Sequence, residues 1–260
     1  MDVLLKDPFA YLDIFLLTFV RMISFFISVP LFGTRNIPRT VKVILALFLT
    51  IIIINIQPME LSTSSANIIP YAILVIKEFI VGWLIGFGAY LVFSIITLSG
   101  QLIDYQIGFT MVNVFDPLSQ IQLTITGNFY YYLLLLMMLA TDTHFFLIKA
   151  LTESFKWIPI GNVVFRPTLY PSVMSFFKDY FIIALKIAGP MIGVMLIINV
   201  VLGILARATP QMNMFVIGLP LKLMTGLVVL LITISAFPSV SEWIFDKMLN
   251  VIDIIIKGMS

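Results

Sequence analysis

The sequence contains no cysteine, a single histidine and few charged residues. The absence of cysteine excludes disulfide bonds, thiolate metal sites and thiol catalysis. Charged residues make up 11% of the chain and apolar residues 61%, and the mean hydropathy is +1.12. A soluble 29.3 kDa protein of this composition would have too little polar surface to stay dispersed, so we expect a membrane protein or a membrane-embedded subunit.

Strong net charge is also lacking. The formal value is +2, and no basic run is typical of binding to nucleic acid or to anionic lipid. The first apolar stretch is too long for a cleaved signal peptide and has no small-residue cleavage site, so we expect it to remain in the mature protein. Nucleic acid is therefore not an expected partner.

Six apolar stretches approach the roughly 20 residues that a membrane-spanning helix needs. They cover about residues 10–30, 41–57, 69–99, 118–148, 180–206 and 213–237. We predict an all-α membrane protein of long apolar helices, in which Gly100 ends the third helix and Asp116 and Pro117 begin the fourth. Small-residue spacing at Gly82 and Gly86, and at Gly189 and Gly193, predicts close helix contacts.

The C-terminal residues predict an amphipathic helix after Phe237 and Pro238. Its apolar positions are Val240, Trp243, Ile244, Met248, Val251, Ile252 and Ile255, and its polar positions are Glu242, Asp246, Asn250 and Asp253. Because the polar face is acidic, we expect a partner helix rather than anionic lipid to cover the apolar face.

Polar residues interrupt the apolar pattern between Gly100 and Gln122. They are Gly100, Gln101, Asp104, Gln106, Gly108, Asn113, Asp116 and Pro117. Non-helical backbone at membrane depth is stable only where protein covers it or where it lines a water-filled cavity, so this segment is expected to border a passage. Basic clusters at residues 35–42 and 149–178 would lie on opposite sides of six simple crossings, which leaves the membrane orientation open.

Ionisable residues within the apolar stretches need partners. Arg21 lies about 12 Å along the helix axis from Asp13, too far to pair, so its partner must come from another helix or another chain. Lys77 and Glu78 are neighbours that point in different directions, and each is expected to have its own partner. We interpret Arg21 and Glu78 as subunit-contact residues of an assembly, with transport as the alternative role for Arg21.

Asp142, Thr143 and His144 form the one cluster that resembles acid–base chemistry, but it has no catalytic sequence context. We predict no enzyme, no metal site and no cofactor. The alternative is a stand-alone secondary transporter that uses Asp104, Lys186 or His144 at an intramembrane polar site.

A compact polar turn separates the last two long apolar stretches. Arg207, Pro210, Gln211 and Asn213 form it, and either a simple turn or a contact with a partner would explain them.

Several motifs are spread over almost the whole chain. They are Arg21 with Pro30 and Pro38; Glu78 with Gly82 and Gly86; Gly100, Asp104, Gln106 and Gly108 before Asp116 and Pro117; Ser154 and Phe155 with Pro159; and Arg207, residues 210–215, Gly218, Pro220 and Lys222. Together these motifs resemble the flagellar biosynthetic protein FliR family.

The resemblance implies a non-enzymatic subunit of the flagellar type III protein export gate in the bacterial inner membrane, at the flagellar basal body. It implies FliP and FliQ as partner subunits, FlhB and FlhA as further partners, membrane lipid around the assembly, and unfolded flagellar proteins as cargo. It also implies a FliP-like part over residues 1–178 and a FliQ-like helical hairpin with the amphipathic helix over 179–260. Orientation, true crossing number, substrates and the choice between flagellar and virulence secretion stay open.

The family likeness further assigns two groups of residues. A pore-plug loop at 106–117 would contain Gly108, Phe109, Met111, Val114, Phe115, Asp116 and Pro117. Subunit contacts would include Arg21, Glu78, Arg207, Pro210, Gln211, Asn213 and Lys222. Phenylalanine and methionine suit a plug, because an apolar constriction can block water and yield to varied peptides.

Overall fold

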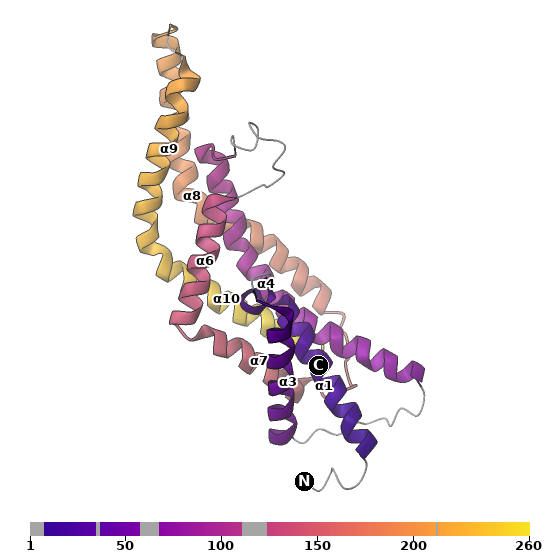
Figure 1. The fold of residues 1–260 in the computed structure, drawn as a ribbon. Coiled ribbons are helices and arrows are strands. Elements are labelled where there is room, and N and C mark those ends of the chain that lie inside the picture. The colour runs from indigo at the N-terminus through magenta and orange to yellow at the C-terminus, as the bar shows by residue number, and fades with distance from the viewer. Residues whose placement is uncertain (1–7, 35–36, 58–67, 111–123, 212) are drawn as a thin grey trace. The chain divides into compact units, whose positions relative to one another are not determined.

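A computed structural model describes residues 8–34, 37–57, 68–110, 124–211 and 213–260, and within these ranges regular structure is helical (Figure 1). The helices are α1 (Pro8–Ser28), α2 (Pro30–Gly33), α3 (Arg39–Ile56), α4 (Ile68–Ile107), α6 (Ile125–Ala140), α7 (Thr143–Trp157), α8 (Leu169–Ala208), α9 (Met214–Thr233), the short 3-10 helix η1 (Ile234–Ala236) and α10 (Phe237–Gly258).

Five described helical segments are long and apolar enough to cross a membrane, or six if α6 and α7 together form one broken span. The predicted all-α membrane fold is confirmed. The predicted lengths of two helices were wrong, since α4 and α8 each contain 40 residues. At 1.5 Å per residue each is about 60 Å long.

Two predicted helix boundaries are corrected. The third helix does not end at Gly100 but continues to Ile107, and Gly108 follows with φ of 96°, a value that favours glycine. The amide groups of Gly108 and Phe109 both donate to the Asp104 carbonyl, at 3.0 Å each. The fourth apolar stretch is not one helix, because it breaks between α6 and α7, where Asp142 has φ of 57°. The predicted start at Asp116 and Pro117 lies outside the described residues.

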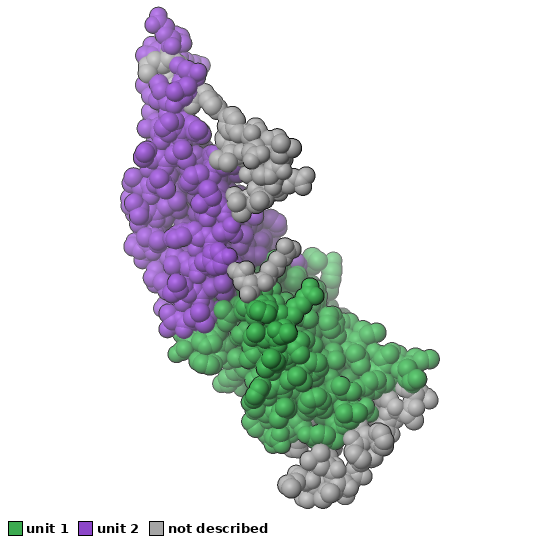
Figure 2. All heavy atoms as spheres, viewed as in Figure 1, with its two compact units in different colours: residues 1–92, 141–176, 245–260 green, residues 93–140, 177–244 purple. Residues whose placement is uncertain are grey.

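The chain divides into two compact units (Figure 2). Unit 1 comprises residues 1–92, 141–176 and 245–260, and unit 2 comprises residues 93–140 and 177–244. Neither unit is continuous in sequence. The predicted division at 178/179 rests on family likeness rather than compactness, and it stays a prediction; the position falls within α8.

Unit 1 packs α1 closely against the first part of α4. A Cβ at Gly82 would collide with the Arg21 carbonyl and the Ser24 hydroxyl, and one at Gly86 would lie 2.8 Å from the Phe25 carbonyl. The close contact predicted from Gly82 and Gly86 is therefore confirmed. Around it lie fully buried apolar side chains: Leu17, Met22, Phe25, Phe26, Val81, Ile85, Leu147 and Leu151.

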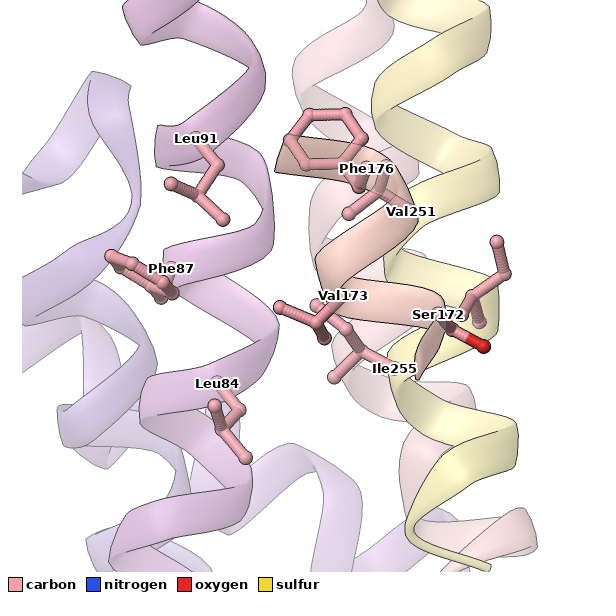
Figure 3. A pocket seen from close by; sticks show the side chains of 9 residues that line it. Leu84, Phe87, Leu91, Ser172, Val173, Phe176, Val251 and Ile255 are labelled. Carbon is pink, nitrogen blue, oxygen red and sulfur yellow. The ribbon is translucent and has the colours of Figure 1, made fainter. Parts of the chain in front are cut away.

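The C-terminal helix α10 follows most of its predicted pattern, but Trp243, predicted on the covered face, is 41% exposed. Its apolar residues Ile244, Met248, Val251, Ile252 and Ile255 are buried, whereas its acidic residues Glu242, Asp246 and Asp253 are exposed. In unit 1, α10 lies beside α4 and the start of α8 around an apolar cavity of about 60 Å³ (Figure 3). Leu84, Phe87 and Leu91 line it from α4, and Val173 and Phe176 line it from α8. The apolar face of α10 was expected to be covered by a partner helix, and part of that cover is provided by α4 and α8 of the same chain.

Unit 2 packs the second part of α4 against α6, α8 and α9. Gly100 meets Gly127 of α6 so closely that a Cβ at Gly100 would overlap the Gly127 backbone. Tyr180 donates its hydroxyl to the Ser94 carbonyl at 3.1 Å. By contrast, a Cβ at Gly189 or Gly193 would meet no described atom within 4 Å, so the close contact predicted for these two glycines does not form within the described chain.

Candidate functional site

An ion pair is buried at the centre of unit 1. The Arg21 Nε donates to Glu78 Oε2 at 2.6 Å, and neither side chain has exposed surface. Arg21 is placed by α1 and Glu78 by α4, whose backbones approach each other because Gly82 has no side chain. The partner expected from another helix or chain is therefore supplied by another helix.

The same two side chains also hold the segment between α7 and α8. Arg21 Nη1 donates to the Ile158 carbonyl at 3.0 Å and lies 3.5 Å from the Ser154 hydroxyl, and its guanidinium carbon is 4.2 Å from the centre of the Phe155 ring. Glu78 Oε1 accepts from the Gly161 amide at 2.9 Å. The pair thus joins α1, α4, α7 and the following loop through charge-assisted hydrogen bonds.

This arrangement is suited to holding helices in register rather than to chemistry. Both Glu78 oxygens are engaged, and Arg21 Nη2 is the one guanidinium nitrogen with no hydrogen-bond partner among the described atoms. A buried charge that is paired and hydrogen-bonded is tolerated, whereas a buried charge without its partner is strongly destabilising. Direct contact of either side chain with another subunit stays a prediction.

A second buried carboxylate, Asp104 of α4, caps the start of α6 in unit 2. Its two oxygens lie 3.1 and 3.2 Å from the Thr126 amide, which donates to them. The first amides of a helix lack intrahelical partners and carry partial positive charge, so a carboxylate is stabilised there. Asp104, proposed from the sequence as a transport residue, thus has a structural role in this fold.

The polar turn between α8 and α9 is exposed. Arg207 lies in the last turn of α8, and Pro210, Gln211 and Asn213 follow it. The Asn213 carbonyl accepts from the Val216 amide at 3.1 Å. Lys222 is half-buried in α9, two turns farther along. All four turn residues are exposed, and their contact with a partner stays a prediction.

The predicted pore plug is described only at its beginning. Gly108 and Phe109 are half-buried and form the turn that ends α4. Met111, Val114, Phe115, Asp116 and Pro117 lie outside the described residues. The plug therefore stays a prediction.

The Asp142–His144 cluster lies at the break before α7. Asp142 is exposed, the Thr141 and Thr143 hydroxyls are 2.7 Å apart, and His144 Nδ1 is buried with no partner among the described atoms. The His144 ring centre is 4.1 Å from that of Phe145. Within the described ranges, no group of three or more His, Asp or Glu side chains is placed to hold a metal ion.

Large apolar side chains also cover much of the surface. On α8 the exposed ones include Met174, Phe181, Ile182, Leu185, Leu196, Ile197, Val200, Val201, Ile204 and Leu205, and on α9 Val216, Met224, Leu227, Val228, Leu231 and Ile232. In water such a surface would aggregate, so lipid or other protein must cover it. The fold and its buried polar clusters define a helical integral membrane protein.

Comparison with known proteins identifies the family of membrane proteins to which the chain belongs. The sequence matches the family described as "Bacterial export proteins, family 1" over residues 12–248. The chain belongs to this family. The flagellar biosynthetic protein FliR of Bacillus subtilis (strain 168) is 33% identical over 252 residues, covering 94% of this chain and 92% of its own length. The protein of the same name from Aquifex aeolicus (strain VF5) is 32% identical, and the match covers 90% of this chain and 89% of that protein. The one from Escherichia coli (strain K12) is 26% identical, and the match covers 96% of this chain and 95% of that protein.

Sequence reasoning missed the roles of Ser154, Phe155 and Gly161. The first two belong to the family pattern, and the structure places both at the Arg21 guanidinium. Gly161 has φ of 82° and donates to Glu78, 83 positions away. Such long-range contacts leave no local periodicity in the sequence.

Proposed function

We propose that this chain is a non-enzymatic subunit of the flagellar type III protein export gate, which helps form and plug the channel for unfolded flagellar proteins. Its partners are FliP and FliQ subunits, with FlhB and FlhA as further export proteins, in the bacterial inner membrane at the flagellar basal body. Family membership supports an export role. The observation that carries the assembly part of the proposal is the exposed apolar surface of α8.

The hydrocarbon core of a lipid bilayer is too thin to cover the whole exposed apolar surface of α8. Exposed apolar residues extend from Met174 to Leu205, which is about 46 Å of helix, against a hydrocarbon core of about 30 Å. Fitting this length into the core requires a tilt near 50°, beyond the usual range of roughly 0–40°. The same stretch exposes Lys178, Asp179 and Lys186, which hydrocarbon disfavours. Partner helices with matching polar groups would cover both kinds of residue.

The family-based division gives this surface a role. Residues 179–260 contain most of α8 together with α9 and α10, and they would form the FliQ-like hairpin beside neighbouring subunits. Residues 1–178 would form the FliP-like part. Arg207, Pro210, Gln211 and Asn213 would contact a partner from the connection between α8 and α9, and Lys222 would do so from α9.

The channel would be closed by the plug loop that follows α4. Gly108 ends the helix and starts the loop, and Phe109, Met111, Val114 and Phe115 would supply the apolar stopper. We expect a shortened Phe109–Phe115 segment to raise ion leakage through the resting complex in reconstituted vesicles. The control is the variant K257Q/D253N, which alters an exposed ion pair outside the plug and outside the proposed subunit contacts and should leave the leak unchanged. An unchanged leak in the plug variant would remove the plug role.

Co-expression tests the assembly itself. The chain expressed alone should aggregate or be degraded, and FliP and FliQ should rescue it, because they cover α8 and α9. The rival function, a secondary transporter, predicts a stable solo protein that binds a small solute saturably. Such a result would overturn the gate assignment.

A further inference from the structure

A cavity of about 330 Å³ opens between α3 and α7 within unit 1. Its walls differ in character. Leu49, Ile52, Ile53, Ile56 and Gln57 line it from the end of α3, and Lys149, Thr152, Glu153 and Lys156 line it from α7. Its volume lies at the lower end of the roughly 300–1,000 Å³ that ligand sites occupy.

The apolar wall belongs to a helix of membrane-spanning length. The 18 residues of α3 extend about 27 Å, close to the thickness of the hydrocarbon core. Apolar residues fill its centre, and the polar residues Asn55 and Gln57 mark its C-terminal end. As a membrane-spanning helix, α3 would place the cavity where hydrocarbon gives way to lipid headgroups.

The polar wall is a stripe on one face of α7. Lys149 and Lys156 are seven residues apart, which places them about 10.5 Å apart along the helix axis and on the same side. Lys149 Nζ lies 4.0 Å from Glu153 Oε1, and the two side chains are 65% and 47% exposed, so this pair is weak. Lys156 is exposed and forms no ion pair with any described residue. The cavity wall keeps a net charge of +1.

The residue next to Lys156 fits the same boundary. Trp157 is 58% exposed at the end of α7. Tryptophan is enriched at membrane–water interfaces, where its ring lies at headgroup level. Two lysines and an apolar wall therefore line the cavity, and an exposed tryptophan follows directly after the second lysine.

We propose that this cavity binds the headgroup of an anionic phospholipid. The phosphate lies between the Lys149 and Lys156 ammonium groups, and the first part of the acyl chains lies against Ile52 and Ile56. A free phosphate would use the lysines but not the apolar wall, and a zwitterionic lipid would not satisfy the excess positive charge. The sequence shows no basic run here, because the two lysines converge through helical spacing rather than adjacency.

The test measures lipid binding to the purified complex of the full chain with its partner subunits. After removal of co-purified lipid, phosphatidylglycerol or phosphatidylcholine is added back, and bound lipid is counted by native mass spectrometry. We expect the double variant K149Q/K156Q to lose about one bound phosphatidylglycerol per chain and to bind it about 30-fold more weakly at that site. K149R/K156R, which keeps both charges, should retain it.

Two further variants distinguish a lipid site in this cavity from a general effect of protein charge. R39Q/K257Q removes the same charge at exposed positions outside the cavity and outside the proposed subunit contacts, and it should leave binding unchanged. I52W fills the apolar wall without changing charge and should reduce lipid binding as K149Q/K156Q does, which keeps the proposal testable if the lysine variant fails to assemble.

The proposal is wrong if K149Q/K156Q or I52W binds phosphatidylglycerol like the parent complex, or if R39Q/K257Q loses it equally. It is also wrong if phosphatidylcholine is retained as well as phosphatidylglycerol. Displacement by an excess of inorganic phosphate would assign the site to a free anion instead.

Discussion

Arg21 and Glu78 are 57 positions apart in sequence, and their side chains meet at 2.6 Å with no exposed surface on either. The pair lies where α1 and α4 approach most closely, beside Gly82, and it also contacts the segment that leaves α7. One interaction thus fixes the relative register of three helices in unit 1.

Replacing one member of this pair should destabilise the protein strongly. Arg21→Met or Glu78→Leu leaves an unpaired buried charge, and we expect each to lower stability by about 3–5 kcal/mol. The double variant should lose much less than the sum of the two. Thermal unfolding of the purified complex in detergent gives the relative stabilities of the two single variants and the double variant.

The exposed pair Lys257 and Asp253 serves as the control. It has the same 2.6 Å separation, but its side chains are more than half exposed. Its removal should change stability by less than about 1 kcal/mol. Equal effects at the two pairs would contradict the role given to burial.

Gly82→Ala should destabilise the contact between α1 and α4. The added methyl group would collide with the Arg21 carbonyl, a backbone atom that cannot rotate away, and we expect a loss of about 1–3 kcal/mol. Gly88→Ala is the matched control in the same helix, because its methyl group would meet the movable end of the Ile255 side chain and no backbone atom. We expect that change to cost less than Gly82→Ala, since a side-chain end can shift and alanine favours a helix over glycine. Accumulation of the co-expressed complex and its melting temperature report both effects, and an undisturbed Gly82→Ala complex would refute the contact.

Asp104→Ala should loosen the start of α6. The Thr126 amide would be left buried without its acceptor, at a cost of about 1–3 kcal/mol, and Asp104→Asn should cost less because one acceptor oxygen remains. Hydrogen exchange at residues 125–128 should rise in the alanine variant. A normal exchange rate combined with loss of solute transport would favour the transporter alternative instead.

Gly161→Ala should weaken the attachment of the loop after α7. At φ of 82° any residue with a Cβ is strained, and the added atom would also lie 3.3 Å from Leu74. We expect a loss of about 1–2 kcal/mol and faster proteolysis near residue 161. Gly193→Ala, in an open position of α8, should leave the loop protected.

The helical fold was predictable because it depends on local composition. Long apolar stretches and the 3.6-residue pattern of α10 are sufficient to identify it. The predicted helix boundaries were wrong where tertiary contacts determine them. A glycine at position 100 suggested a helix end, but Gly100 lies inside α4. Glycine is required there because a Cβ atom at Gly100 would overlap the backbone of Gly127.

The buried sites were only partly predictable. Sequence spacing shows that Arg21 needs a distant partner, but it cannot select Glu78 or the Ile158 carbonyl, since these contacts depend on how three helices pack. Asp104 stands out in the sequence only as a charge in an apolar region. Its task as a cap on α6 follows from the position of Thr126 in space, 22 residues later.

Photo-crosslinking from α8 tests the central claim most directly. A photoreactive residue at Ile197, Val200 or Ile204, all more than 60% exposed, should crosslink to partner subunits in cells that build flagella. The same probe at Met195, which is fully buried, should crosslink within the chain. Adducts with lipid alone at all three exposed positions would contradict the account that partner subunits cover this helix.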